Sequence, residues 1–341
     1  MKKIKVLVVD DSQLARELIS AVLSSDGDIE VVGEACNGSE AVKKVRELGP
    51  DIVTMDIEMP VMNGLEAIEN IMADSAVPIL VVTTRGDAQT AYAAISKGAL
   101  DLIQKPDLNP ASAAEFLDKV KLLSKIKVLT HIGGKLHRTN TFTEHPEKRF
   151  DLSGNNRIVS IASSTGGPEA LSVVLSALPA DLPCPVTVAQ HISDGFVASM
   201  VEWLKKIIRL RIKVAEQGDI LEAGTVYVSP SEKHMEISPA KSVSMLDRSP
   251  KDIYRPSCDA LLSSAARVYG GRSIGVILTG MGNDGVVGMN MIKDSGGHTI
   301  AQDRNTSVVY GMNKVAIDSG CIDRVLPIDE IAAGIIDLMS K

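Results

Sequence analysis

Serine, histidine and aspartate residues in the second half of the chain are of the types that form a hydrolytic triad. Ser163 and Ser164 stand in the stretch SIASSTGGPE, where an apolar strand runs into glycines and a helix. A hydroxyl at such a turn is exposed at the edge of a sheet, and the N–H groups of a helix N-terminus stabilise an oxyanion there. The pattern leaves open which serine is the nucleophile, and a helix cap would use the same residue types.

A serine nucleophile needs a base and a carboxylate that orients the base. His191 directly follows the strand CPVTVAQ, and Asp284 lies in the loop after the strand SIGVILTG, so we expect both at the sheet edge that carries Ser164. His234 opens a hairpin-like strand and His298 begins another strand, which places them at the opposite edge. Triads occur in several chain orders on unrelated folds. These residues therefore predict acyl transfer by a serine hydrolase.

Acidic, hydroxyl and amine side chains end the strands expected in the first half of the chain. In strand order they are Asp10 and Asp11, Asp56, Thr83 and Lys105. Carboxylates crowded at one sheet edge repel one another unless a hard divalent cation joins them, and Mg²⁺ prefers such oxygen ligands. An ionised aspartate beside Mg²⁺ and a lysine is suited to accept a phosphoryl group.

Alternating apolar runs and amphipathic stretches predict the elements that position these residues. Five strand–helix units fill about 125 residues, so we expect a flavodoxin-like, five-stranded parallel sheet with helices on both faces. From residue 157 the alternation resumes and predicts a second, larger, doubly wound and mostly parallel α/β domain that includes a hairpin. The stretch between them lacks periodicity and is expected to be a linker. The expected boundaries are 1–126, 127–153 and 154–341.

Composition restricts the class of protein. The 341 residues suffice for two domains, and only 3% are aromatic, so aliphatic side chains must build the cores. A net charge of -7 without a basic run argues against a nucleic-acid partner. Four scattered cysteines without a CxxC pair are typical of a reducing cytoplasm. No apolar stretch reaches the ~18 residues of a membrane span, so we expect no membrane insertion.

The first part of the chain resembles the receiver domain of two-component response regulators. The stretches VLVVDDS, MDIEMPVMNG, VVTT and QKP carry this likeness over residues 1 to about 125. It implies that Asp56 is phosphorylated and that Thr83 and Lys105 contact the phosphoryl group. It also implies a cis peptide bond before Pro106. The implied Mg²⁺ ligands are Asp11, Asp56 and the backbone carbonyl of Glu58, with Asp10 beside them.

The second part resembles the catalytic domain of the CheB family, whose members are protein-glutamate methylesterases that also deamidate glutamines. The motifs SSTGGP, AQHISDGF, YRPSCDALL and LTGMGNDG carry the likeness, in this order, over about 155–341. It implies that Ser164 is the nucleophile, His191 the base and Asp284 the partner of the base. The oxyanion would be assisted by Thr165 and by the backbone N–H of Met281.

The two resemblances together imply a phosphorylation-activated hydrolase of chemotaxis. It would demethylate glutamyl methyl esters and deamidate glutamines on methyl-accepting chemotaxis receptors, with the histidine kinase CheA as phosphodonor. Hydrolysis would need no cofactor, and a monomer is expected. Two alternatives stay open. One is a receiver-controlled esterase for another substrate, and the other is a non-catalytic module that binds a nucleotide phosphate at the glycine-rich turns 166–167 and 280–285.

Overall fold

The structure of the chain is a computed structural model, which describes residues 2–84, 88–107, 109–126, 128, 156–249 and 252–339. The chain divides into two compact units, residues 1–141 and 142–341. The linker expected over 127–153 lies almost wholly outside the described residues, so its boundaries stay a prediction. Within the described residues, no helix is long and apolar enough to cross a bilayer.

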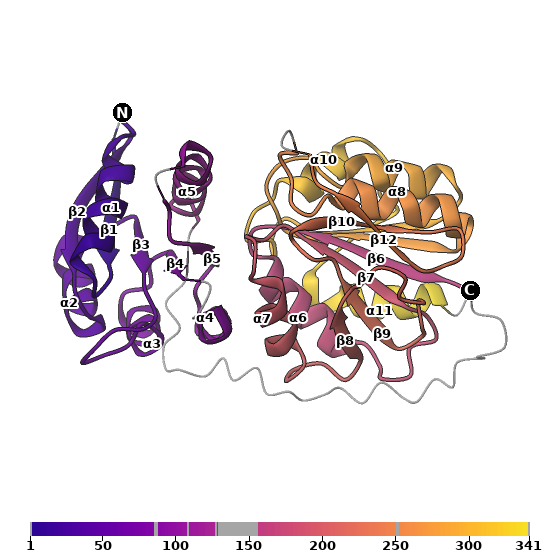
Figure 1. Ribbon diagram of the computed structural model, residues 1–341, viewed down its shortest axis with the longest axis horizontal. Coiled ribbons are helices and arrows are strands. Elements are labelled where there is room, and N and C mark those ends of the chain that lie inside the picture. Colours follow the sequence, from indigo (N-terminus) through magenta and orange to yellow (C-terminus); the bar gives the residue numbers. More distant parts are fainter. Residues whose placement is uncertain are drawn as a thin grey trace. The chain divides into compact units, whose positions relative to one another are not determined.

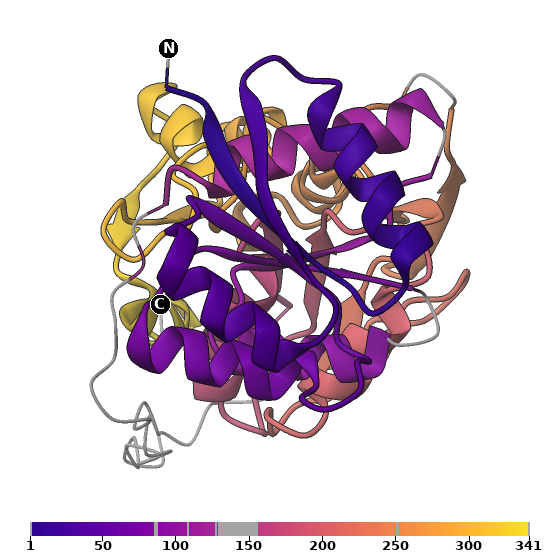
Figure 2. The same ribbon diagram turned by 90° about the vertical axis from the view of Figure 1, so that its left-hand side faces the viewer.

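The first unit is a five-stranded parallel sheet in the order β2-β1-β3-β4-β5, with helices on both faces (Figures 1 and 2). This is the strand order of flavodoxin-like folds, so the predicted class is confirmed. The strands are β1 (Ile4–Val9), β2 (Ile29–Ala35), β3 (Ile52–Met55), β4 (Ile79–Thr83) and β5 (Asp101–Gln104). The helices are α1 (Gln13–Ser24), α2 (Gly38–Leu48), α3 (Gly64–Asp74), α4 (Ala88–Ser96) and α5 (Pro110–Leu123).

The turn between β3 and α3 has local features that fix its path beside the end of the sheet. β3 is buried along its whole length, as expected of a strand covered on both faces. Asn63 begins α3 with a capping box, in which its side chain and that of Glu66 each accept the other's backbone N–H. A Cβ on Gly64 would lie 2.1 Å from the carbonyl oxygen of Asp56, so only glycine permits this approach.

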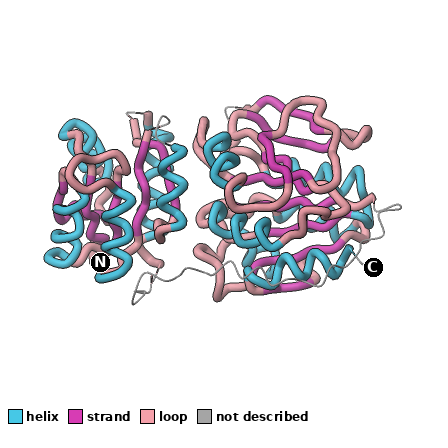
Figure 3. Tube along the Cα trace, turned by 90° about the horizontal axis from the view of Figure 1, so that it is seen from below, coloured by secondary structure: helices cyan, strands magenta, loops and turns pink. Residues whose placement is uncertain are grey.

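The second unit is built on a seven-stranded sheet in the order β14-β13-β12-β6-β7-β9-β8, in which all the pairs are parallel. Figure 3 distinguishes the strands, in magenta, from the helices, in cyan. A separate antiparallel pair, β10 and β11, stands beside this sheet. The strands are β6 (Ile158–Ser163), β7 (Val186–Gln190), β8 (Arg211–Val214), β9 (Thr225–Val228), β10 (Lys233–Ile237), β11 (Val243–Asp247), β12 (Ser273–Ile277), β13 (His298–Gln302) and β14 (Arg324–Leu326). The helices are α6 (Gly167–Ala177), α7 (Val197–Leu204), α8 (Cys258–Tyr269), the short 3₁₀ helix η2 (Gly270–Arg272), α9 (Val286–Asp294), α10 (Met312–Asp318) and α11 (Ile328–Met339).

Two details of the fold differ from the sequence-based expectations. The helix α10 is not predicted by the sequence, because its seven residues make only about two turns and show no clear period. The expected cis bond between Lys105 and Pro106 is wrong, since the cis peptide bond among the described residues joins Arg255 and Pro256. An X-Pro bond favours trans by about 0.5–1 kcal/mol unless contacts select cis.

Candidate active site

The centre of the seven-stranded sheet brings together the loops that carry the expected triad. The strands β12, β6 and β7 are neighbours, and Asp284, Ser164 and His191 follow their carboxyl ends. The backbone N–H of Ser164 donates to the carbonyl of Thr279 at 3.0 Å, which joins the first two loops. The N–H of His191 donates to the carbonyl of Ser163 at 3.0 Å, which joins the third. The three residues therefore lie at one edge of the sheet, as predicted.

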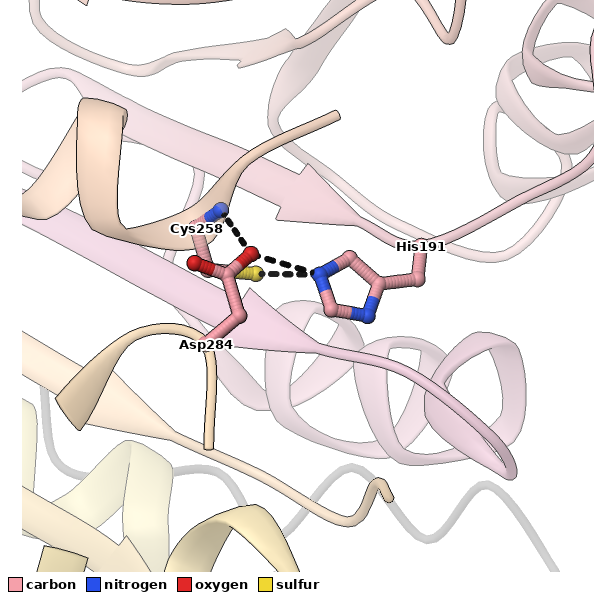
Figure 4. A group of neighbouring side chains, drawn as sticks. All are labelled: His191, Cys258 and Asp284. Carbon is pink, nitrogen blue, oxygen red and sulfur yellow. Dashed lines mark hydrogen bonds and ion pairs between the residues drawn. The ribbon is translucent and has the colours of Figure 1, made fainter. Parts of the chain in front are cut away.

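The imidazole ring of His191 lies against the carboxylate of Asp284. The two atoms in contact, His191 Nε2 and Asp284 Oδ2, are 2.8 Å apart. Figure 4 shows the other ring nitrogen pointing away from the carboxylate. That nitrogen, Nδ1, has no hydrogen-bond partner among the described residues and is free to accept a proton. Tyr254 stacks on the ring, with centroids 5.1 Å apart and planes inclined by 15°.

Donors at the start of α8 hold the carboxylate of Asp284. The N–H of Cys258 donates to Oδ2 at 2.6 Å, and the N–H of Asp259 donates to Oδ1 at 2.9 Å. The hydroxyl of Ser257 donates to Oδ1 at 3.2 Å. Burial alone would raise the pKa of Asp284, but the bond to His191 and these N–H groups outweigh it and hold the pKa below its usual value. The carboxylate is therefore ionised and fixed in position.

The two serines at the end of β6 have different surroundings. Ser163 is fully buried, and its hydroxyl donates to the amide oxygen of Gln190 at 2.6 Å. Ser164 is also buried, with 8% of its surface exposed, but its hydroxyl has no hydrogen-bond partner within the part of the chain that the structure describes. The amide nitrogen of Gln190 donates to the carbonyls of Ser164 and His191 at 2.8 and 2.7 Å. Gln190 thus fastens the serine loop to the histidine loop.

The turn after Ser164 depends on two glycines. Gly166 has a φ of 76°, in the left-handed region that favours glycine. A Cβ on Gly167 would lie 1.8 Å from the side-chain oxygen of Gln190, so no larger residue fits there. The turn leads directly into α6, whose first N–H groups carry positive potential. The chain around Ser164 therefore has the geometry of an anion-binding strand–helix turn.

The residues expected to assist the oxyanion lie on two loops beside Ser164. Thr165 is buried in the turn, whereas Met281 is 48% exposed on the loop after β12. That loop lies close to Ser164: a Cβ added to Gly280 would be 2.6 Å from the Cβ of Ser164. Neither the hydroxyl of Thr165 nor the N–H of Met281 has a partner among the described residues. Both donors are thus available to a ligand.

His234 lies beside this site, so its predicted place at the opposite edge of the sheet is wrong. Its strand β10 pairs with β11 outside the parallel sheet, where the edge rule for parallel strands does not apply. Its Nδ1 accepts the N–H of Ser257 at 2.9 Å, and its Nε2 lies 2.9 Å from Oδ2 of Asp252. His298 does begin its strand, as predicted.

The carboxyl edge of the first sheet carries the expected polar cluster. Asp10, Asp11 and Asp56 each offer a carboxylate oxygen, and these atoms lie within 4.8 Å of one another. Lys105 Nζ lies 2.7 Å from Asp10 Oδ2 and 3.0 Å from Asp56 Oδ2. Burial raises the pKa of Asp56 to about 6, although the nearby Lys105 opposes this shift.

This cluster fits a hard divalent cation and a phosphoryl group. Its donors are oxygens, which Mg²⁺ prefers, and the clustered carboxylates supply the negative charge that a cation offsets. The hydroxyl of Thr83 is buried at the end of β4 and has no hydrogen-bond partner among the described residues, as expected of a group that contacts an added ligand. Glu58, whose carbonyl the resemblance adds to the set, is exposed in the loop after β3.

Comparisons with known proteins identify both units. Residues 159–335 match the profile of the CheB methylesterase family, and residues 6–114 match that of the response regulator receiver domain. Over 98% of its length the chain is 47% identical to a protein of Paramagnetospirillum magneticum, 96% of which is covered. That protein is named protein-glutamate methylesterase/protein-glutamine glutaminase 3. The chain belongs to the CheB methylesterase family.

Other CheB-family proteins agree with this placement. A protein-glutamate methylesterase/protein-glutamine glutaminase of Pyrococcus horikoshii is 39% identical, over 97% of this chain and 92% of the relative. The crystal structure of the Thermotoga maritima CheB methylesterase catalytic domain is 38% identical, with a TM-score of 0.52. The match covers 53% of this chain and 98% of that domain. The family and the fold class predicted from the sequence are confirmed.

Three residues of this CheB-family site lie inside the motifs AQHISDGF and YRPSCDALL, although the sequence by itself assigns them no role. Gln190 is the last residue of its strand and directly precedes His191, so its position at a strand end already indicates that it lies at the edge of the sheet near the histidine. Tyr254 and Cys258 come from the loop and first turn of α8. No strand pattern ties that stretch to the sheet edge, so only the fold brings these two residues to the histidine.

Proposed function

We propose that the chain is a phosphorylation-activated protein-glutamate methylesterase that also deamidates glutamines, acting in the cytoplasm on chemotaxis receptors. The observation that carries this proposal is the 2.8 Å contact between His191 and Asp284, on two loops that are both hydrogen-bonded to the loop of Ser164. The name of the 47% identical relative supports the same activity. A receiver domain implies a histidine kinase as phosphodonor, and we infer that this kinase is CheA.

The proposed reaction is acyl transfer through a serine ester. Ser164 Oγ attacks the γ-carbonyl carbon of a glutamyl methyl ester, and Nδ1 of His191 accepts the hydroxyl proton. Thr165 and the N–H of Met281 stabilise the tetrahedral oxyanion. His191 then protonates the departing methoxide, which leaves as methanol. Water attacks the carbonyl carbon of the acyl-enzyme and gives a proton to His191, which passes it to Oγ of Ser164 as the bond between Oγ and the carbonyl carbon breaks and the receptor carboxylate leaves. With a glutamine substrate the leaving group is ammonia.

The surroundings of the two serines favour Ser164 as the nucleophile. The hydroxyl of Ser163 is already donated to Gln190 inside the fold, where substrate does not reach it. The hydroxyl of Ser164 has no partner among the described residues, and the Cβ of Ser164 lies close to Gly280 in the loop of Met281. Asp284 remains ionised, so it stabilises the imidazolium that forms on His191 during each proton transfer.

The first unit supplies the proposed regulatory site. Asp56 is the phosphoryl acceptor, Thr83 donates a hydrogen bond to a phosphoryl oxygen, and Lys105 pairs with the phosphoryl charge. Mg²⁺, when bound, would offset the charge of the incoming phosphate. The residues that would hold it are Asp10, Asp11, Asp56 and the carbonyl of Glu58. Phosphorylation then shifts an equilibrium between two states of the protein, of which one is the more active.

We expect methanol release from membranes that contain methylated chemotaxis receptors, and a faster release when Mg²⁺ and a small acyl phosphate are added. The increase should fall within about 5–150-fold, the range usual for coupled sites. Asp56→Asn keeps the shape of the side chain but removes the acceptor, so its rate should not respond. Absence of methanol in all conditions contradicts the hydrolase, and an equal response of Asp56→Asn contradicts the regulatory site.

His234 is proposed to position Asp284 through the first turn of α8. It accepts the N–H of Ser257, which is next to the residues whose N–H groups hold the carboxylate. His234→Asn places an amide oxygen near the position of Nδ1, whereas His234→Gln reaches Asp252 but offers no acceptor to Ser257. We expect the asparagine variant to keep most of the activity.

The glutamine variant should lose both activity and stability. The N–H of Ser257 is then left without its acceptor inside the fold, at a cost of ~1–3 kcal/mol. Thermal unfolding and kcat for methanol release, measured on both variants, test this expectation. Equal kcat values for the two variants would show that the bond to Ser257 does not position the carboxylate.

A further inference from the structure

A thiol lies against the His191–Asp284 pair, and the proposed hydrolysis gives it no task. Cys258 Sγ is 3.4 Å from Nε2 of His191. One imidazole nitrogen, one sulfur and one carboxylate oxygen of these residues all lie within 4.8 Å of one another. Figure 4 shows the sulfur and the carboxylate facing the same ring nitrogen. The three side chains come from the loops that follow β7 and β12 and from the start of α8.

These three donors are of the types that Zn²⁺ binds. A tetrahedral zinc ion with bonds of ~2.05 Å to nitrogen and ~2.3 Å to sulfur keeps those two atoms about 3.5 Å apart. The sulfur and Nε2 are 3.4 Å apart, so they need almost no movement. Nε2 and Oδ2 would open from 2.8 Å to about 3.3 Å, a small shift of the carboxylate. The cluster of the receiver unit offers only carboxylate oxygens, which suit Mg²⁺ instead.

The thiol is protonated when no metal is bound. Cys258 is fully buried, and burial, followed by the charge of Asp284, raises the pKa of the thiol well above its usual value. A cation that binds the sulfur must therefore displace one proton, which leaves to the solvent. This release is specific to a sulfur ligand, because the ionised carboxylate has no proton to lose.

We propose that Zn²⁺, or another soft divalent cation, binds His191, Cys258 and Asp284 and inhibits the hydrolase. Zinc binds a neutral imidazole, so with the metal on Nε2 the ring proton stands on Nδ1. Nδ1 then cannot accept the proton of Ser164, and the nucleophile is not activated. Inhibition rests on the proposed function, whereas binding requires only the three ligands.

Binding is tested on the full-length chain with excess Mg²⁺ present, so that the receiver cluster is occupied. Competition with a chromophoric chelator measures the affinity for Zn²⁺. Cys258→Val removes the sulfur at similar volume and should weaken binding by at least about 100-fold. Cys36→Ser removes an exposed cysteine and is the matched control, which should bind as the wild type does. Equal affinity of the wild type and Cys258→Val overturns the proposal.

Proton release gives a second measurement that does not depend on activity. Calorimetry in two buffers of different ionisation enthalpy should show about one more proton released by the wild type than by Cys258→Val. If Cys258→Val fails to fold, the Co²⁺ complex of the wild type decides the question. Thiolate coordination gives a near-ultraviolet charge-transfer band, and its absence overturns the proposal.

Methanol release then separates this inference from the proposed function. Each protein is compared with its own rate in the absence of zinc. Micromolar free zinc should stop the wild type and Cys36→Ser, and it should leave the relative rate of Cys258→Val unchanged. If the wild type is active and zinc does not change its rate, the metal site is refuted and the proposed hydrolase activity stands. Cysteine-dependent zinc binding by a chain without hydrolase activity supports the site and refutes the proposed function.

Discussion

Replacing Ser164 by alanine should abolish methanol release and leave the fold intact. The attacking oxygen is lost, and removal of a triad nucleophile lowers kcat by on the order of 10⁶-fold. Stability should change little, because the lost hydroxyl has no hydrogen-bond partner among the described residues. Labelling with a serine-directed fluorophosphonate should be lost together with the activity, whereas thermal unfolding should stay close to that of the wild type.

Ser163→Ala is the matched control one residue away. It leaves the buried amide oxygen of Gln190 without this donor, so it should lower the free energy of unfolding by ~1–3 kcal/mol. Ser164 and its turn remain, and the variant should be labelled and active. An active, labelled Ser164→Ala beside an inactive Ser163→Ala would identify Ser163 as the nucleophile, in spite of its complete burial and its bond to Gln190.

The parallel sheets and their edges are predictable from the sequence because parallel strands have a simple rule. Each strand is an apolar run, and the residue after it must lie at the carboxyl edge that its neighbours share. This rule by itself places Ser164, His191 and Asp284 together. It also places Asp56 and Lys105 together, whose side chains are in contact at 3.0 Å.

The same rule fails where the chain leaves the parallel sheet. His234 belongs to an antiparallel pair, whose position relative to the sheet depends on packing and not on strand direction. Cys258, in the first turn of α8, and Tyr254, in the loop before it, lie near the histidine because the N-terminus of α8 packs against Asp284. No local sequence pattern predicts the orientation of that helix. The choice between Ser163 and Ser164 likewise depends on Gln190, a neighbour 27 residues away from Ser163.

Both carboxylate oxygens of Asp284 accept hydrogen bonds, and this pattern determines the effect of replacing Asp284 by asparagine. Oδ2 accepts from His191 and from the N–H of Cys258, whereas Oδ1 accepts from the N–H of Asp259. An amide has only one accepting oxygen. Its NH₂ group must therefore face one backbone N–H, and in one of the two orientations it also donates to Nε2 of His191. That orientation leaves the ring proton on Nδ1, the nitrogen that must accept the proton of Ser164.

Asp284→Asn should therefore lower kcat for methanol release by about 10⁴-fold, the loss seen when a triad histidine is held in the wrong tautomer. The variant should also lose ~1–3 kcal/mol of stability at neutral pH. Because the pKa of Asp284 is lowered in the folded state, its stabilising effect is present above the usual aspartate pKa of ~3.9 and is lost as the pH falls through the lower folded-state value. Urea unfolding at a series of pH values should show the stability difference from the wild type narrowing below about pH 4. Asp247→Asn, at an exposed carboxylate, should match the wild type throughout. A difference that stays constant with pH would mean that the ionised form of Asp284 is not the one held by α8.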